Sequence, residues 1–206
     1  MNAPLAVVAA TGNPGKLAEL ARALRGLPLE LDSLASFPGV VPAEETGESF
    51  AENARLKAQA AARATGLHAL ADDSGLVVPA LGGAPGVRSA RFAGPRATDP
   101  ENIRLLLSRL EGAADRSAWF ACSLCLVHPS GRILWEGEGR CHGVIAPAPA
   151  GERGFGYDPV FFYPPARRTF GELSPEEKER VSHRGAAVRA LRDAFREGIP
   201  GTGEAG

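Results

Sequence analysis

The chain has 206 residues, 44% of them hydrophobic and 23% charged, and its formal net charge is −1. This composition is typical of a globular protein with a well-buried core, and the lack of a basic surplus argues against a broad nucleic-acid-binding face. The N-terminus lacks the basic residues of a signal peptide, and no apolar stretch is long enough to span a membrane. We therefore expect a cytoplasmic protein with neither a nucleic-acid partner nor a membrane partner.

The first part of the chain alternates apolar runs with helical patterns. Its first strand is a continuous run of small apolar residues, suited to burial on both faces, and the next helix and strand complete a βαβ pattern. The third strand leads into Asp72-Asp73-Ser74-Gly75, a sequence typical of a turn. The pattern predicts strands over 5–10, 29–34 and 67–71 and helices over 15–27 and 49–65.

The second part of the chain carries turn and capping signals. Residues 129–131 separate two strand patterns, which indicates an antiparallel hairpin. A capping box at 174–177 begins a long last helix, which Ser182 could interrupt. The pattern predicts a helix that starts near 99–100, strands over 117–127, 132–145 and 160–163, and a final helix that ends near 196. No repeat or linker divides the chain, so we expect one domain over 1–197 and a frayed tail over 198–206.

Three cysteines form no paired framework, which favours a reducing compartment. Cys122 and Cys125 make a CxxC motif, the usual prompt for a metal or redox site. They lie in the strand pattern over 117–127, however, where residues three apart face opposite sides. We therefore expect neither a zinc site nor a redox pair here.

The first candidate site is the TGNPGK sequence between the first strand and the first helix. A Gly-containing turn that feeds a helix N-terminus presents free N–H groups, which suit phosphate, and Lys16 adds a positive charge. It is not a P-loop, because no Ser or Thr follows Lys16 to hold magnesium. An ordinary strand-to-helix turn with a surface lysine is the alternative.

Two acidic pairs could hold a metal. Asp72–Asp73 follows a strand at the end where open α/β sheets bind ligands, and Glu44–Glu45 lies in the preceding loop. Two carboxylates in one cleft need a cation, and Mg²⁺ is held by one or two carboxylates together with substrate phosphates. The alternative for Asp72–Asp73 is that it caps the Ser74–Gly75 bend.

Two further segments could read a base. In GFGYDP, at 154–159, two glycines flank Phe155, so its ring can stack on a nucleobase. His183 and Arg184 are donors that could read a carbonyl on a base edge. Alternatively, Phe155 belongs to the core and His183 is a packed or exposed helix residue.

Lysine is rare in this chain, which has three lysines against twenty arginines. Lys16, Lys57 and Lys178 each lie in a patterned segment. A chain so rich in arginine uses it wherever a planar guanidinium serves as well as an ammonium. The three remaining lysines therefore indicate sites that need a compact ammonium. Chance survival at the surface is the alternative for any single one.

Taken in order, these segments closely resemble the inosine/xanthosine triphosphate pyrophosphatase family, also called Ham1-like. The resemblance runs from Ala10 to about Ala187. It rests on five motifs in the right order: TGNPGKLAEL, EETGESFAENARLKA, ADDSGLVVPALGGAPGVRSARFAG, GFGYDPVF and LSPEEKERVSHR. It implies an α/β fold with a long twisted mixed sheet flanked by helices, two lobes around a central cleft, and a homodimer.

The resemblance also implies roles for individual residues. It makes Asp73 the proton acceptor and a metal ligand. It makes Glu44 the second ligand, with Glu45 a close competitor and Asp72 a further choice. The implied substrate contacts are Thr11, Gly12, Asn13, Pro14, Gly15, Lys16, Lys57, Ser74, Arg91, Phe155, Gly156, Tyr157, Asp158, Lys178, His183 and Arg184.

The implied reaction is the Mg²⁺-dependent hydrolysis of deaminated purine nucleoside triphosphates (ITP, dITP and XTP) to the monophosphate and pyrophosphate. Donors aimed at a 6-oxo group would leave the amine of adenine facing an unmatched donor. The alternatives are a related pyrophosphatase for other nucleotides and a nucleotide-binding regulatory module without turnover. A phosphotransferase is a weaker third, because no acceptor-specific feature is visible. Asp73 beside a phosphate site favours the enzymes over the module.

Overall fold

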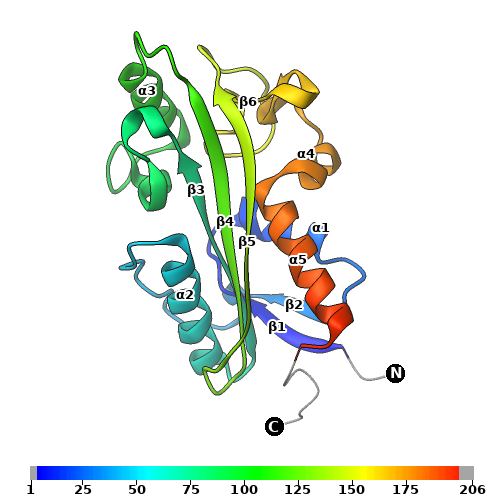
Figure 1. Cartoon of the computed structure of the whole chain (residues 1–206). Helices are drawn as coiled ribbons and strands as arrows, with labels where there is room; N and C mark the ends of the chain where they lie inside the picture. Colours follow the sequence, from blue (N-terminus) through cyan, green and yellow to red (C-terminus); the bar gives the residue numbers. More distant parts are fainter. Residues whose placement is uncertain (1–3, 200–206) are drawn as a thin grey trace. The chain divides into compact units, whose positions relative to one another are not determined.

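The computed structural model describes residues 4–199 and has a mixed α/β fold (Figure 1). Seven strands are hydrogen-bonded in the order β2-β1-β3-β4-β5-β6-β7. β1 pairs parallel with β2 and β3, whereas β6 pairs antiparallel with β5 and β7. The predicted mixed sheet with helices is therefore confirmed. The strands are β1 (Leu5–Ala9), β2 (Leu29–Ser33), β3 (His68–Val77), β4 (Ser117–Val127), β5 (Ile133–Ile145), β6 (Phe161–Tyr163) and β7 (Arg168–Thr169).

The helices follow the predicted order with shifted ends. A break divides the last predicted helix at Ser182, as its sequence had indicated. The α-helices are α1 (Pro14–Ala23), α2 (Phe50–Thr65), α3 (Asp99–Arg109), α4 (Pro175–Val181) and α5 (His183–Glu197). Short 3-10 helices are η1 (Leu34–Ser36), η2 (Pro79–Leu81), η3 (Gly86–Arg91), η4 (Asp158–Val160), η5 (Pro164–Ala166) and η6 (Phe170–Glu172). None of the helices in residues 4–199 is long and apolar enough to cross a membrane.

The chain divides into two compact units. Unit 1 contains the residues up to Asp73, 122–139 and those from Arg184 onward, and unit 2 contains 74–121 and 140–183. The division falls inside β3, β4 and β5, so each of these strands contributes to both units. The cleft expected between two lobes stays a prediction.

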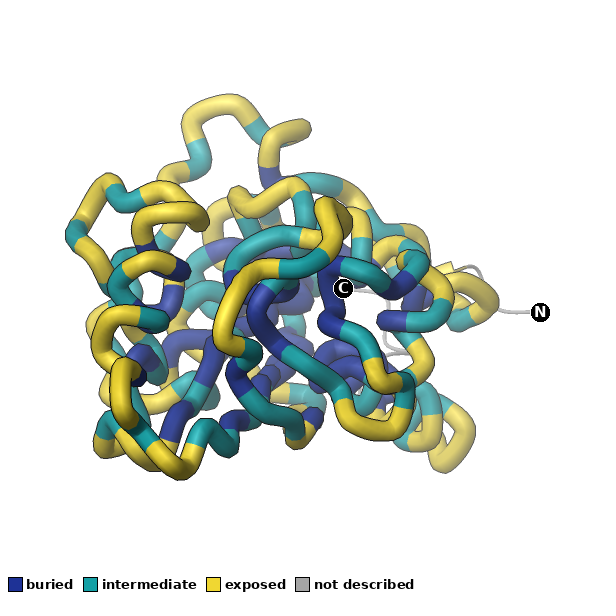
Figure 2. Tube along the Cα trace, turned by 90° about the horizontal axis from the view of Figure 1, so that it is seen from above, coloured by how far each residue is buried: buried dark blue, intermediate teal, exposed yellow. Residues whose placement is uncertain are grey.

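Unit 1 buries both faces of its strands. Figure 2 shows buried stretches of the chain alternating with exposed loops. One apolar cluster joins α1 and α5 to β1 through Val7, Leu20 and Leu191. The other joins α2 to the opposite face through Val8 and alanines such as Ala58, whose small side chains let the helix lie close to the strands. This arrangement confirms the predicted βαβ start. Cys122 and Cys125 belong to different clusters, on opposite faces, as their spacing predicted.

Unit 2 has an aromatic core. Phe120, Phe161 and Phe170 pack together, with ring centroids 4.6 to 5.9 Å apart, among aliphatic side chains from β3 and α3. Such burial of aromatic rings stabilises a unit strongly for its size. The core supports η4 and η6, so it fixes the segment that follows the GFGY turn.

One predicted element is wrong. The strand expected over 67–71 does not end in a turn at 72–75, because β3 continues through that sequence to Val77. Leu76 is fully buried, and its N–H donates to Ser89 Oγ at 2.9 Å. Asp, Ser and Gly favour turns locally, but burial of the following apolar residues and partners for the polar side chains extend the strand.

The tail expected to be frayed from Gly198 begins inside the described part of the chain. Ile199 is buried in the core of unit 1. Residues 200–206 lie outside the described residues.

Candidate active site

The TGNPGK segment joins β1 to α1 in unit 1. Asn13 caps the helix: its Oδ1 accepts the N–H of Lys16 at 3.1 Å, and Pro14 occupies the first turn. Gly12 has no atom within 4 Å of where a Cβ would lie, so the backbone here is open. The loop therefore presents an accessible helix N-terminus, a setting that favours anions.

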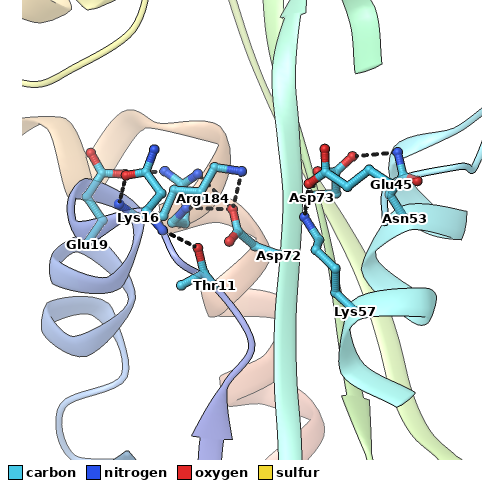
Figure 3. Close-up of polar contacts among 10 residues, drawn as sticks. Thr11, Lys16, Glu19, Glu45, Asn53, Lys57, Asp72, Asp73 and Arg184 are labelled. Carbon is cyan, nitrogen blue, oxygen red and sulfur yellow. Dashed lines mark hydrogen bonds and ion pairs between the residues drawn. The ribbon is translucent and has the colours of Figure 1, made fainter. Parts of the chain in front are cut away.

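Asp72 is the centre of a buried ionic network. Its Oδ2 accepts from Arg184 Nη2 at 2.9 Å and lies 3.4 Å from Lys16 Nζ (Figure 3). Arg184 Nη1 also donates to Glu19 on α1. Burial by itself would raise the pKa of Asp72, but the charges of Lys16 and Arg184 outweigh it and hold that pKa well below its usual range. Asp72 is therefore an anion at neutral pH.

Asp73 meets a different set of partners. Its Oδ1 accepts from Lys57 Nζ at 2.8 Å, and its Oδ2 accepts from Asn53 Nδ2 at 3.2 Å. The same ammonium lies 2.9 Å from Glu45 Oε1, so Lys57 bridges two carboxylates. Burial raises the pKa of Asp73 despite the opposing charges of Lys57 and Lys16.

The two aspartates do not act as a pair. Consecutive strand residues point to opposite faces, and Figure 3 shows Asp72 on the α1 and α5 side of β3 and Asp73 on the α2 side. The expectation that both carboxylates face one cleft and share one cation is therefore wrong.

The acidic loop contributes Glu45 to this cluster. Glu45 is partly buried against Lys57, whereas Glu44 is exposed and contributes its backbone oxygen to a bond from Thr46 N–H at 3.1 Å. The structure thus places Glu45, rather than the preferred Glu44, beside Asp73. Within residues 4–199, no group of three or more His, Cys, Asp or Glu side chains is arranged to hold a metal by itself.

The 154–158 loop of unit 2 is held by its own ion pair. Lys178 Nζ pairs with Asp158 Oδ2 and lies 4.8 Å from the centroid of the Phe155 ring. The same Asp158 oxygen accepts the N–H of Phe155 at 2.9 Å. From α3, Asp99 Oδ2 accepts the N–H of Gly156 at 2.6 Å. These contacts present the Phe155 ring, which is half-buried, on an ordered loop.

The other residues expected to contact substrate differ in how far they are buried. Tyr157 is buried and donates to Ser89 O at 2.9 Å, which ties the loop to η3, where Arg91 is half-exposed. His183 is buried, with its ring stacked 4.7 Å from that of Phe120, so it packs in the core of unit 2. Ser74 follows Asp73 on β3 and is half-buried.

Three site residues went unnoticed in the sequence: Glu19, Asn53 and Asp99. A signal existed for Asn53, which precedes Lys57 by four residues and so shares its face of α2. Glu19 likewise follows Lys16 by three residues on α1. Asp99 lies at the start of the helix predicted near 99–100, but its bond to Gly156 joins residues 57 positions apart, which spacing does not reveal.

Comparison with known proteins places the chain. The model of the Ham1 family matches residues 7–194. A dITP/XTP pyrophosphatase of Thermus thermophilus is 53% identical over 196 residues, covering 94% of this chain and 93% of that protein. One of Yersinia pestis is 50% identical over 194 residues, covering 93% and 98%. The structure of a HAM1 protein from Coxiella burnetii superposes with a TM-score of 0.85 at 46% identity, covering 94% of this chain and 99% of that one. The chain therefore belongs to the Ham1 family.

Proposed function

We propose that this protein hydrolyses deaminated purine nucleoside triphosphates (ITP, dITP and XTP) to the nucleoside monophosphate and pyrophosphate. The observation that carries the proposal is Asp73, a buried carboxylate of raised pKa that Asn53 and Lys57 hold in place beside Glu45. The names of the relatives, which are 50–53% identical, support the choice of substrate. The proposal includes a homodimer and a cytoplasmic location.

The acidic cluster fits Mg²⁺. One ammonium, Lys57 Nζ, lies within 2.9 Å of both Glu45 and Asp73, so these two carboxylates already converge on a cation. Mg²⁺ commonly uses one or two carboxylates and completes its shell with water and substrate phosphates. Glu45 and Asp73 would hold the ion, which would offset the negative charge of the triphosphate.

The residues of unit 1 supply the rest of the chemistry. The amides at 11–15 and the ammonium of Lys16 bind the phosphates at the start of α1. Asp73 accepts a proton from water as the water oxygen bonds to the α-phosphorus. The bond between the α-phosphorus and the bridging oxygen of the β-phosphate breaks, and pyrophosphate leaves with that oxygen. Lys57 keeps the Oδ1 of Asp73 fixed, and Asn53 holds its Oδ2.

Base selection belongs to the loop over 155–158 with Lys178, His183 and Arg184. The Phe155 ring stacks on the base, and Asp158 keeps the loop in place through Lys178. The resemblance makes His183 and Arg184 the donors for the 6-oxo group, although the His183 ring packs against Phe120 in this structure. Since Arg184 also contacts Asp72 and Glu19, its guanidinium is already oriented. Ser74 and Arg91 complete the substrate contacts.

A nucleotide panel with Mg²⁺ tests the proposal. Pyrophosphate and orthophosphate are measured separately for dITP, ITP, XTP, ATP and GTP. We expect pyrophosphate from the first three and much slower turnover of ATP. Orthophosphate as the product would contradict the proposal. Equal rates on ATP and ITP would also contradict it and would favour a different nucleotide pyrophosphatase. Nucleotide binding without any product would favour the regulatory module. Asp73→Asn should bind dITP and lose turnover.

A further inference from the structure

Asn53 is a fully buried amide with a partner at each end. Its Oδ1 accepts the N–H of Gly47 at 2.8 Å, and its Nδ2 donates to Asp73 Oδ2 at 3.2 Å. Gly47 belongs to the loop that carries Glu45. One side chain of α2 therefore joins the acidic loop to the carboxylate on β3.

Both contacts require the same orientation of the amide. A backbone N–H needs an acceptor and an ionised carboxylate needs a donor, so Oδ1 must face Gly47 and Nδ2 must face Asp73. The reverse orientation would place two donors together at one end and two acceptors at the other. Buried polar groups left in that state cost stability, so the pair of contacts fixes the amide.

Two residues of α2 contact the carboxylate of Asp73, one at each oxygen. Asn53 and Lys57 are four residues apart, so they lie one turn apart on one face of the helix. Asn53 donates to one oxygen of Asp73 and Lys57 to the other. The plane of the carboxylate is thereby set from a rigid helix.

The loop side of the contact is equally tight. A Cβ at Gly47 would lie 2.7 Å from Asn53 Oδ1 and 2.7 Å from Glu52 Cβ, closer than real Cβ atoms approach. Only glycine lets the loop come this close to α2. Glu45, two residues earlier, is thus brought against Lys57.

We propose that Asn53 is a positioning residue for the reaction: its amide orients the carboxylate of Asp73 and holds the Glu45 loop against it. This inference rests on the proposed function, because it assumes that Asp73 accepts the proton. Misplacing a reacting group by about 1 Å can cost 10²-fold in rate without weakening substrate binding. The expected signature is therefore a fall in kcat with little change in KM.

Asn102 offers a matched control. It is also a buried asparagine on a helix, its Oδ1 accepts the N–H of Ala93 at 2.8 Å and its Nδ2 donates to Ala90 O at 3.1 Å. Removing either amide breaks two buried hydrogen bonds. A purely structural role for Asn53 would make the two alanine variants alike.

The experiment compares wild type with Asn53→Ala, Asn53→Asp and Asn102→Ala, using dITP and saturating Mg²⁺ at a temperature where all four are folded. We expect both alanine variants to lower Tm to a similar extent. Asn53→Ala should lower kcat about 10- to 100-fold with KM within about threefold, whereas Asn102→Ala should keep kcat within about threefold. Equal kcat losses in the two alanine variants would show a structural role and overturn the inference.

Asn53→Asp separates the two ends of the amide. The new carboxylate still accepts from Gly47 N–H but offers no N–H to Asp73. Hydrogen exchange should therefore show a protected Gly47 amide in this variant and an unprotected one in Asn53→Ala, while kcat falls in both. Near-wild-type kcat in Asn53→Asp would overturn the positioning of Asp73. Absence of dITP turnover in wild type would overturn the proposed function and this role together, whereas an active Asn53→Ala beside an active wild type overturns only this role.

Discussion

Arg184 donates two hydrogen bonds to a single oxygen of Asp72, from Nη2 at 2.9 Å and from Nε at 3.3 Å. Both side chains are at most 2% exposed, so this contact fastens the start of α5 to β3 inside unit 1. A buried ion pair of this kind gains little over a well-packed apolar pair, but removal of one partner strands the other charge.

Asp72→Asn should destabilise unit 1 strongly at neutral pH. The substitution leaves the guanidinium of Arg184 without its full counter-charge, and breaking a buried pair in this way costs about 3–5 kcal/mol. Urea unfolding of the metal-free protein measures the loss. Asp32→Asn, at an exposed position on β2, is the control and should change the free energy of unfolding by less than about 0.5 kcal/mol. Equal effects would contradict the importance of the buried network.

The same pair predicts a pH dependence. The pKa of Asp72 is lower in the folded chain than its ordinary value of 3.8, so the unfolded chain binds the extra proton first as the pH falls. Its stabilising contribution is full above about pH 4 and is lost as the pH falls further toward the folded pKa. The difference in stability between wild type and Asp72→Asn should therefore narrow below pH 4. A difference that stays constant down to pH 2 would argue against a depressed pKa.

The sequence predicted which residues belong to the candidate site better than it predicted which of them contact one another. The scarcity of lysine marked three residues, and in the structure each pairs with a buried or partly buried carboxylate: Lys16 with Asp72, Lys57 with Asp73 and Glu45, and Lys178 with Asp158. Composition could indicate these positions because burial between carboxylates favours a compact ammonium. It could not name the partners, which lie 12 to 56 residues away along the chain.

The strand predicted to end at residue 71 shows why the geometry was harder to predict. Local propensity favours a bend at Asp-Asp-Ser-Gly, and only long-range contacts, such as those of Asp72 with Arg184, keep the strand extended. Once the strand continues, alternation sends the two aspartates to opposite faces. The turn at 129–131 was easier to predict, because it is local: β4 and β5 are neighbours in the sheet, and His128 N–H donates to Arg132 O at 2.9 Å. The spacing of Cys122 and Cys125 likewise predicted that they face opposite sides of the strand. Burial raises the thiol pKa of Cys122 and of Cys125 to about 12, in keeping with structural cysteines.

Lys57→Arg should cost activity more than stability. The guanidinium keeps the charge but is larger and planar, so it cannot occupy the point between Asp73 Oδ1 and Glu45 Oε1 that the ammonium fills. We expect kcat for dITP to fall at least about tenfold, with a loss of less than about 1.5 kcal/mol in stability, measured by steady-state kinetics and urea unfolding. Arg63→Lys, at an exposed position of the same helix, is the control. Wild-type kinetics in Lys57→Arg would show that this site does not require lysine, so that the residue is a lysine by chance.

Asp158→Asn should weaken substrate binding. The neutral amide loses the charge partner of Lys178, while the N–H of Phe155 retains a weaker acceptor. A looser loop presents the Phe155 ring less well, and stacking on an aromatic ring contributes about 1–3 kcal/mol per base. KM for dITP should rise about tenfold, with a smaller change in kcat. An unchanged KM, with kcat alone reduced, would place Asp158 in the chemical step instead.

Glu45→Gln and Glu44→Gln should differ in the Mg²⁺ concentration that gives half-maximal activity. Glu45 Oε1 lies 2.9 Å from the ammonium that also contacts Asp73, whereas the side chain of Glu44 is exposed. Because hard cations prefer charged oxygen ligands, Glu45→Gln should raise the Mg²⁺ concentration for half-maximal activity about tenfold or more. Glu44→Gln removes the same charge one residue away and should leave that concentration within about twofold, so it controls for the general loss of negative potential. Direct titration with Mn²⁺, followed by its paramagnetic signal, separates metal affinity from turnover. The reverse ranking of the two variants would restore Glu44 as the ligand and reduce Glu45 to a partner of Lys57.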